Sequence, residues 1–413
     1  MTYIALSSLF LILGLLRDRG VVLFIITMAT LPFSNSLSQY FYKFGLYSYD
    51  YFFAGAFIAN IARNVKTGHL RLIVPKWPSI LFITILAYAA VALLAGKAID
   101  VYFLRDLRPA VFSVEVAMAA SIIKTNRIRL TEDSVFRILI LAGASNLFWL
   151  SLSISGVISS EDEYYTKNNY KYFDASTYIS ALFAIYYLTQ SLHPQQAWST
   201  KSTRRTQLIA VLVSLLSVIF SGYRTLILAT AISALVSSAR KPGKFIATSA
   251  TILVSVISFL YLANFYGADR VLDGTTASGV MTQLSTRYEP ALNVIASFTP
   301  INYILGAGFS TVFEVDWFGY RDLDMKNNFV DSAYITFFAK YGIIGILMLS
   351  IIASSLRNIA PKQLGTPIVI YLLVLFAVYC ISYQAASAGL ITGCLLLRSL
   401  PYQPSRKNHD NSI

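Results

Sequence analysis

The sequence predicts an all-α polytopic membrane protein with about 12 to 13 transmembrane helices. Hydrophobic residues make up 56% of the 413 residues and charged residues only 13%, and the mean hydropathy is +0.61. A water-soluble domain of this length needs far less apolar sequence to fill its cores. The apolar residues are also grouped into runs that approach the ~20 residues a helix needs to cross ~30 Å of hydrocarbon. We therefore expect the chain to lie within a membrane.

The expected transmembrane helices occupy two stretches of the chain. Residues 1–266 carry the first ten spans with short loops, 267–330 form one long loop, 331–398 carry the C-terminal spans and 399–413 form a basic tail. The spans fall near 2–16, 21–36, 48–62, 79–96, 109–123, 134–156, 173–192, 207–222, 225–238, 245–266, 331–353 and 366–383, with a thirteenth near 386–398. The Met-Thr-Tyr start has no basic region and no small-residue cleavage site, so we expect a retained span there.

The charged residues predict the orientation of these spans. Alternate loops on one side of the expected membrane collect 21 of the 33 basic residues and only four of the 20 acidic residues. Short cytoplasmic loops are enriched in Lys and Arg, so this side is expected to be cytoplasmic. The net charge of +13 then reflects topology. A nucleic-acid partner is not expected, because the chain has neither zinc-finger spacing nor a basic base-reading helix.

The only two cysteines, Cys380 and Cys394, lie inside apolar segments. They are expected to pack as small buried hydrophobic residues, and their positions support neither a disulfide nor a metal site.

The long outer loop, 267–330, has seven acidic and four basic residues together with many apolar ones. Long loops of this kind usually carry function. Within it, Leu284, Tyr288, Leu292 and Ile295 recur at helical spacing, which predicts an interfacial helix with one apolar face. Arg287 flanks that face. The glycines of "LGAGFS" further on predict a tight turn, with a phosphate-binding nest of N–H groups as the alternative.

Arg224 lies within an apolar run from residue 207 to 238. As one helix these 32 residues would be about 48 Å long, which exceeds a single crossing. Basic residues flank the run at both ends, so two crossings must lie between them. Gly222 can bend the chain and Ser221 can satisfy the freed backbone groups. Arg224 is then expected at the outer surface.

Arg224 has two interpretations. It can extend its side chain to lipid phosphates without any further role. Alternatively, it can join Arg287 and the two arginines of "LRDLRPAVF", Arg105 and Arg108, around one outer cavity. Guanidinium groups bind phosphate bidentately and stay charged, so such a cluster suits a lipid-linked diphosphate.

Three segments resemble the bacterial O-antigen polymerase and ligase superfamily. These are "FSGYRTLILATAISALV", "RYEPALNVIASFTPINYILGAGFS" and "NNFVDSAYITFFAKYGIIGILMLS", and the span "YFDASTYISALFAIYYL" is similar as well. The resemblance covers mainly the C-terminal 240 residues, and the N-terminal third matches only in its number of spans and style of loops.

The resemblance implies a glycosyltransferase of the GT-C kind in the bacterial inner membrane, with its active site facing the periplasm. An undecaprenyl-diphosphate-linked glycan would be the donor, and a sugar hydroxyl of the acceptor would displace the lipid diphosphate. Arg224 and Arg287 would hold that diphosphate. No cofactor or metal is implied, and a chain-length regulator could be a protein partner. Donor or acceptor contacts are assigned to Arg105, Arg108, Tyr223, Arg321 and Tyr334.

The chain departs from the ligases, which carry a histidine near the end of the long loop where this chain has "KNNFVDSAY". Its three histidines, His69, His193 and His409, are all expected on the cytoplasmic side. Asp331 is therefore the candidate general base, with a helix N-cap as the alternative role. The missing histidine favours a polymerase over a ligase.

Other functions remain open at this point. A lipid-linked glycan flippase or other transporter would need polar residues along a path through the membrane, and the expected intramembrane charges are few, mainly Glu115, Arg137 and Lys340. A non-catalytic scaffold would tolerate changes at the outer arginines.

Overall fold

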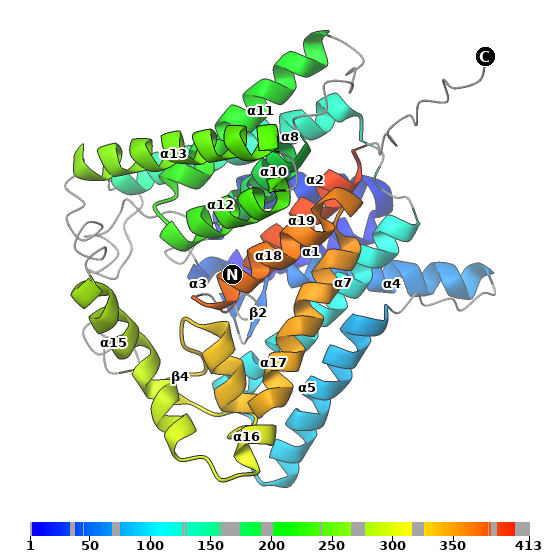
Figure 1. Cartoon of the computed structure of the whole chain (residues 1–413). Helices are drawn as coiled ribbons and strands as arrows, with labels where there is room; N and C mark the ends of the chain where they lie inside the picture. Colours follow the sequence, from blue (N-terminus) through cyan, green and yellow to red (C-terminus); the bar gives the residue numbers. More distant parts are fainter. Residues whose placement is uncertain are drawn as a thin grey trace, which may run out of the picture.

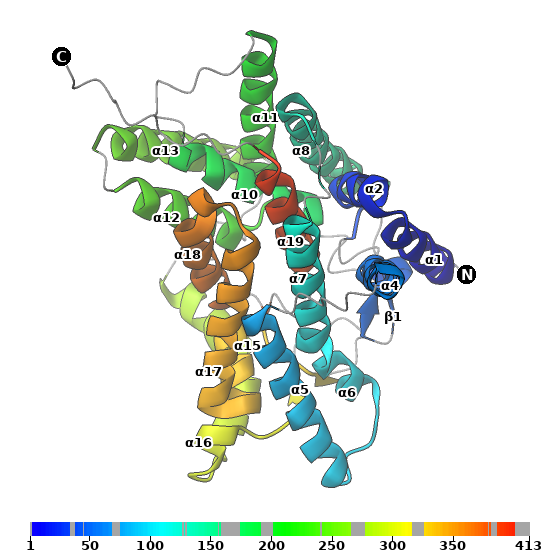
Figure 2. The same ribbon diagram turned by 90° about the vertical axis from the view of Figure 1, so that its right-hand side faces the viewer.

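The computed structural model of the chain describes residues 2–33, 38–43, 45–67, 75–125, 128, 130–155, 157, 174–190, 201–239, 242–265, 277–315, 326–378, 380 and 386–400. Within these ranges the chain is helical apart from two short antiparallel strand pairs (Figures 1 and 2). The prediction of an all-α protein is confirmed.

All but two short helices before the expected outer loop, Ser38–Phe41 and Val101–Asp106, follow the predicted apolar runs. The helices of this part are α1 (Thr2–Leu15), α2 (Arg17–Thr30), α3 (Ser38–Phe41), α4 (Asp50–Thr67), α5 (Lys76–Leu94), α6 (Val101–Asp106), α7 (Arg108–Lys124), α8 (Glu132–Ile154), α10 (Ala175–Gln190), α11 (Lys201–Phe220), α12 (Arg224–Ser238) and α13 (Pro242–Phe265). Strands β1 (Tyr42–Lys43) and β2 (Leu46–Tyr47) pair ahead of α4.

The rest of the described chain contains the loop and the C-terminal helices. Its elements are α15 (Ala277–Ala296), α16 (Asn302–Leu305), β3 (Phe313–Glu314), β4 (Lys326–Asn327), α17 (Ala333–Ile359), the 3₁₀ helix η3 (Lys362–Leu364), α18 (Gly365–Phe376) and α19 (Ala386–Arg398). Every run predicted to be a span coincides with a helix, although individual ends differ by several residues.

Three of the described helices are both long and apolar enough to cross a membrane. They are α5, α8 and α17, with mean hydropathies of 2.1, 1.7 and 2.0 over their most apolar windows. Several other apolar helices in the described ranges are shorter, among them α1 and α19. Length and composition therefore support a membrane location.

Helix α10 forms the centre of the helical assembly. It packs against α8, α11, α12 and α19, and its side chains from Ala175 to Ile185 are almost completely buried. The Thr177 hydroxyl of α10 donates to the Asn146 amide oxygen of α8 at 2.6 Å, and Asn146 Nδ2 donates in turn to the Ser217 carbonyl of α11 at 3.2 Å. Such interhelical hydrogen bonds fix the register of apolar helices that contact one another through small residues.

The break predicted within residues 207–238 is present. Helix α11 ends at Phe220 and α12 begins at Arg224, with Gly222 between them at a φ of 65°. The Ser221 hydroxyl donates to the Val218 carbonyl at 2.7 Å and accepts the Tyr223 N–H at 3.3 Å. The side chain of Ser221 thus replaces hydrogen bonds that the interrupted helix loses.

The described part of the outer loop is folded against α17. Helix α15 packs on α17 and β3, α16 packs on α17, and a second hydrophobic core forms from Ala291, Phe313, Val315, Val330 and Ala339. The predicted apolar face of α15 is only partly correct. Tyr288 and Ile295 pack on this core, but Ala291 is buried in it while Leu292 is 48% exposed.

Helix α17 is kinked at Gly342, and this residue should be intolerant of a side chain. Its φ of 60° and ψ of −145° lie in a region that other residues avoid at a cost of about 1–3 kcal/mol. An added Cβ would also lie 2.4 Å from the Ile304 carbonyl oxygen of α16. We predict that Gly342→Ala lowers the apparent Tm of the purified protein in detergent.

The matched control is Gly243→Ala in α13, where an added Cβ meets nothing within 4 Å. It should leave the apparent Tm unchanged or raise it slightly, because alanine favours helix over glycine. Equal Tm values for the two variants would contradict the close α16–α17 contact.

Candidate active site on the outer loop

Arg287 and Asp331 form an ion pair where the outer loop meets α17. Arg287 lies on α15 and Asp331 lies just before α17, and Arg287 Nη1 is 3.1 Å from Asp331 Oδ2. Their side chains are 46% and 33% exposed. A pair with this exposure contributes little to stability. Because both side chains are partly exposed, both charged groups are accessible to a ligand.

Two tyrosines next to this ion pair bind the end of α18. The Tyr288 hydroxyl donates to the Ala377 carbonyl at 3.2 Å, and the Tyr334 hydroxyl donates to the Leu373 carbonyl at 3.0 Å. Burial, with a smaller contribution from the Asp331 charge, raises the pKa of the Tyr288 phenol. The candidate site is thus bounded by α15, α17 and α18.

Asp331 does not cap α17. The N-cap is Ser332, whose hydroxyl accepts the Ile335 N–H at 3.4 Å. Val330, the residue before Asp331, is held by Thr336. The Thr336 hydroxyl accepts the Val330 N–H at 3.0 Å and lies 3.1 Å from the Val330 carbonyl oxygen. The cap expected as the alternative role of Asp331 is therefore supplied by its neighbour.

Arg224 and Tyr223 begin α12, which packs along α18. The Ser233 hydroxyl of α12 donates to the Pro367 carbonyl of α18 at 2.6 Å. Tyr223 occupies the N-cap position and is half-buried. The side chain of Arg224 and all of Arg321 lie outside the described residues.

Arg108 does not face an open cavity. Its side chain is 1% exposed, and its guanidinium binds the Asp50 carboxylate, Glu115 Oε1 at 3.2 Å and the Tyr49 hydroxyl at 3.0 Å. Its guanidinium carbon also lies 4.9 Å from the centre of the Tyr47 ring. The sequence-based expectation of an outward-facing Arg108 is therefore corrected: two carboxylates already surround this charge.

Arg105 is half-buried near two aromatic rings. Its guanidinium carbon is 6.0 Å from the centre of the Tyr42 ring and 5.9 Å from that of Tyr102. Burial raises the pKa of the Tyr42 phenol, although the charges of Arg105 and Arg108 oppose this shift. The structure thus connects Arg105 and Arg108 to the β1–β2 and α4 region, whereas Arg287 and Asp331 belong to α15 and α17.

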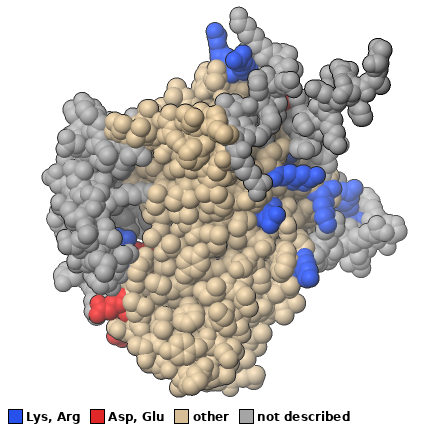
Figure 3. Space-filling view, in the orientation of Figure 1, with Lys and Arg blue, Asp and Glu red and all other residues tan. Residues whose placement is uncertain are grey.

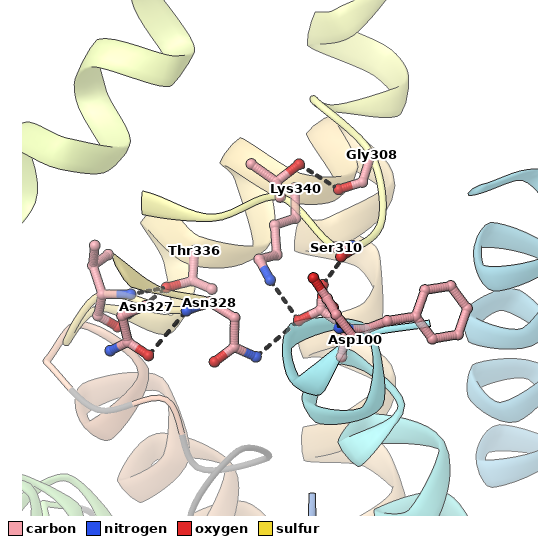
Figure 4. Close-up of polar contacts among 11 residues, drawn as sticks. Asp100, Gly308, Ser310, Asn327, Asn328, Thr336 and Lys340 are labelled. Carbon is pink, nitrogen blue, oxygen red and sulfur yellow. Dashed lines mark hydrogen bonds and ion pairs between the residues drawn. The ribbon is translucent and has the colours of Figure 1, made fainter. Parts of the chain in front are cut away.

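A buried ion pair between Asp106 and Lys340 supports the loop, and the sequence analysis missed it. Lys340 Nζ is 2.5 Å from Asp106 Oδ1, and both side chains are 0% exposed. Asn328 Nδ2 donates to the same oxygen at 3.0 Å, and the Ser310 N–H donates to Asp106 Oδ2 at 2.8 Å. Figure 4 shows Lys340, Asn328 and Ser310 converging from α17 and from two parts of the loop.

The turn in "LGAGFS" is present, but its N–H groups are already used. The Ala307 and Gly308 N–H groups donate to the carbonyls of Ala339 and Lys340, each at 2.9 Å, and the Ser310 N–H binds Asp106. These N–H groups fasten the loop to α17 and α6, so the alternative of a phosphate nest is not supported here.

Cys380 and Cys394 are fully buried free thiols, as predicted.

The fold and site describe a helical protein with three helices long and apolar enough to cross a membrane and an Arg–Asp ion pair on a folded loop. Residues 114–401 match the model of a family of unknown function, DUF6369. Because the match spans well over half of the chain, the protein belongs to this family. The matched segment includes Arg287, Asp331 and Lys340, whereas Asp106 lies before its first residue. No curated protein matches the chain.

Asp106 and Lys340 should depend on each other for stability. Removing one member of a buried ion pair leaves an uncompensated charge and costs about 3–5 kcal/mol. We predict that Asp106→Asn and Lys340→Met each lower the apparent Tm strongly, and that the double variant loses much less than the sum. Thermal unfolding of the four proteins in detergent measures this coupling.

The matched control is the exposed pair on α8, Asp133 and Arg137, in which Arg137 is 75% exposed. Asp133→Asn and Arg137→Met should each change stability by less than about 1 kcal/mol, and their coupling should not exceed about 0.5 kcal/mol. Additive losses at Asp106 and Lys340 would contradict the proposed dependence.

Proposed function

We propose that this protein is a membrane glycosyltransferase that polymerises undecaprenyl-diphosphate-linked oligosaccharides into surface polysaccharide, such as O-antigen or capsule. The exposed Arg287–Asp331 pair carries the proposal, because it combines an anion-binding group and a candidate base in the loop whose sequence resembles the polymerase and ligase superfamily. The reaction would occur at the periplasmic face of the bacterial inner membrane.

The proposal includes a GT-C-like topology in which about 12 to 13 helices cross the membrane. On the face seen in Figure 3, most Lys and Arg side chains lie toward the top and right, Asp and Glu lie at the lower left, and uncharged surface separates them. This separation supports the orientation predicted from the basic loops. Short helices such as α18, with 12 residues, would cross together with adjoining residues.

A second guanidinium near Arg287 would come from Arg224. The charge distribution predicts that α12 runs inward and α18 runs outward, so the two contacting helices are antiparallel. Ser233, bonded to Pro367, lies nine residues after Arg224, and Phe376 lies nine residues after Pro367. The backbone of Arg224 would then be level with the end of α18, which Tyr288 and Tyr334 bind.

The proposed reaction begins when the donor diphosphate binds Arg287 and Arg224. The diphosphate would replace Asp331 as the partner of Arg287, because guanidinium binds phosphate oxygens bidentately. The released Asp331 carboxylate would accept the proton of the acceptor hydroxyl, whose oxygen attacks the anomeric carbon. The bond between that carbon and the diphosphate oxygen breaks, and the guanidinium groups stabilise the charge that grows on the leaving diphosphate.

Two alternatives have weaker support. A ligase would transfer the glycan to a lipid A core, but the superfamily's ligase histidine has no counterpart in this loop. A flippase or transporter would need charged groups along a path through the membrane. Within the described helices, Glu115 and Lys340 are both buried in ion pairs with Arg108 and Asp106. Because these two charges are already paired, a reaction at one membrane face agrees with them better than transport through the membrane does.

Replacement of the proposed diphosphate ligands should abolish polymerisation. In a strain that lacks the wild-type protein, Arg287→Ala and Arg224→Ala should each remove long chains from the surface-polysaccharide ladder while the one-repeat product remains. Loss of a preorganised charge interaction typically slows a reaction about 10²–10³-fold. Arg137→Ala, at an exposed arginine outside the site, is the control and should leave the ladder intact.

Normal ladders from both outer variants would contradict the proposal and favour a scaffold. Loss of all glycan on the lipid core would indicate a ligase or flippase instead.

Asp331→Asn should separate proton transfer from binding. The amide cannot accept the proton, so elongation should fall about 10²–10⁴-fold while the donor still binds to Arg287. Elongation by the purified variant and its affinity for lipid-linked donor measure the two effects. Equal losses of donor binding and elongation would contradict a role for Asp331 as the base.

A further inference from the structure

A cavity of about 390 Å³ lies beyond the C-terminal end of α17, away from the residues of the candidate active site. It is lined by the C-terminal ends of α7 and α19 and by η3. Helix α17 connects the two regions, because Asp331 precedes its first residue and the cavity residue Pro361 follows its last by two positions. The helix is broken at Gly342, and its two segments fold against each other, since a Cβ on Gly345 would lie 2.1 Å from the Phe337 carbonyl oxygen. The second segment, residues 343–359, runs about 25 Å and ends beside the cavity.

The lining of this cavity combines two cations with an apolar wall. Lys362 and Arg398 line it together with Ser399, whereas Ile122, Ile123 and Leu395 contribute apolar side chains, and no carboxylate lines it among the described residues. Arg398 Nη1 donates to the Ala360 carbonyl at 3.0 Å, which holds the guanidinium beside η3. Lys124, the last residue of α7, adds a further positive charge next to Ile123.

This combination restricts the ligand. An aqueous anion such as free phosphate would gain nothing from the isoleucine and leucine side chains, and a neutral lipid would gain nothing from the two cations. An amphiphile with a phosphate group and an alkyl chain uses both parts of the lining. Basic pockets between helices near the cytoplasmic surface bind anionic lipid headgroups in this way.

We propose that the cavity is a binding site for the headgroup of an anionic phospholipid from the surrounding cytoplasmic leaflet. Lys362 and Arg398 contact the phosphate, and the first methylene groups of the acyl chains lie against Ile122, Ile123 and Leu395. The volume holds a glycerophosphate headgroup with the start of its chains, while the rest of the lipid stays in the bilayer. The bound lipid joins the ends of α7, α17 and α19. This site is independent of the proposed glycosyl transfer, which uses the other end of α17.

The test is binding of phosphatidylglycerol to the purified full-length protein, measured by native mass spectrometry and by the lipid-dependent shift in Tm. A juxtamembrane basic residue contributes about 1 kcal/mol to anionic lipid binding, so Lys362→Gln with Arg398→Gln should weaken phosphatidylglycerol binding roughly 30-fold. Phosphatidylcholine should bind weakly to both proteins. Arg204→Gln is the control, because Arg204 is an exposed cation outside the cavity, and it should bind phosphatidylglycerol like the wild type.

The charge-preserving exchange Lys362→Arg with Arg398→Lys separates lost binding from lost folding, and it should retain most of the affinity. Equal phosphatidylglycerol binding by the wild type and the Gln double variant would overturn the proposal. Inorganic phosphate that displaces the lipid and stabilises the protein equally well would also overturn it, because the site would then recognise a free anion.

Discussion

The buried ion pair between Asp106 and Lys340 is the interaction on which the packing of the long loop against α6 and α17 depends. Neither charge can remain alone in an apolar interior, because desolvation of an unpaired ion costs several kcal/mol. Asp106 therefore fixes α6 to α17, and its remaining hydrogen-bonding capacity is used by Ser310 and Asn328 of the loop. One carboxylate thus connects α6 to three positions that lie 204, 222 and 234 residues further along the chain.

This connection explains how a loop can position chemistry. Asn328 is bound to Asp106, Val330 is held by Thr336, and Asp331 follows directly, so the candidate base extends from a segment fixed on both sides. Arg287 is held through the second hydrophobic core, which Tyr288 and Ala291 of the same helix contact. The two groups meet at the surface even though their supports are buried. Such an arrangement combines precise placement with access for a large substrate.

The helices could be predicted from the sequence, whereas the charge pairs could not. Apolar runs and the break at Gly222 depend on local chemistry, and the structure has a helix for every predicted run. Arg108 was expected to face outward because an arginine at the start of a span usually reaches the surface. Its partner Asp50 is 58 residues away, and local pattern carries no information about such a contact. Lys340 was recognised as a costly charge, but Asp106 is 234 residues from it.

Two smaller differences have local causes. Asp331 and Ser332 are both good N-cap residues, and the sequence alone does not tell which of two neighbours accepts the first N–H of the helix. Helical spacing correctly predicts that α15 has an apolar face. The side that packs on the second core is shifted by one residue, because Ala291 and not Leu292 contacts that core. Pairing of Arg287 with Asp331 required the loop to fold back, which periodicity does not encode.

The most direct test of the central claim is the stoichiometry of the reaction in liposomes that contain only the purified chain and a lipid-linked oligosaccharide. We predict that each new glycosidic bond releases one undecaprenyl diphosphate and that glycans of several repeats accumulate. Oligosaccharides that cross the bilayer unchanged, all still attached to their lipid carrier, would contradict it.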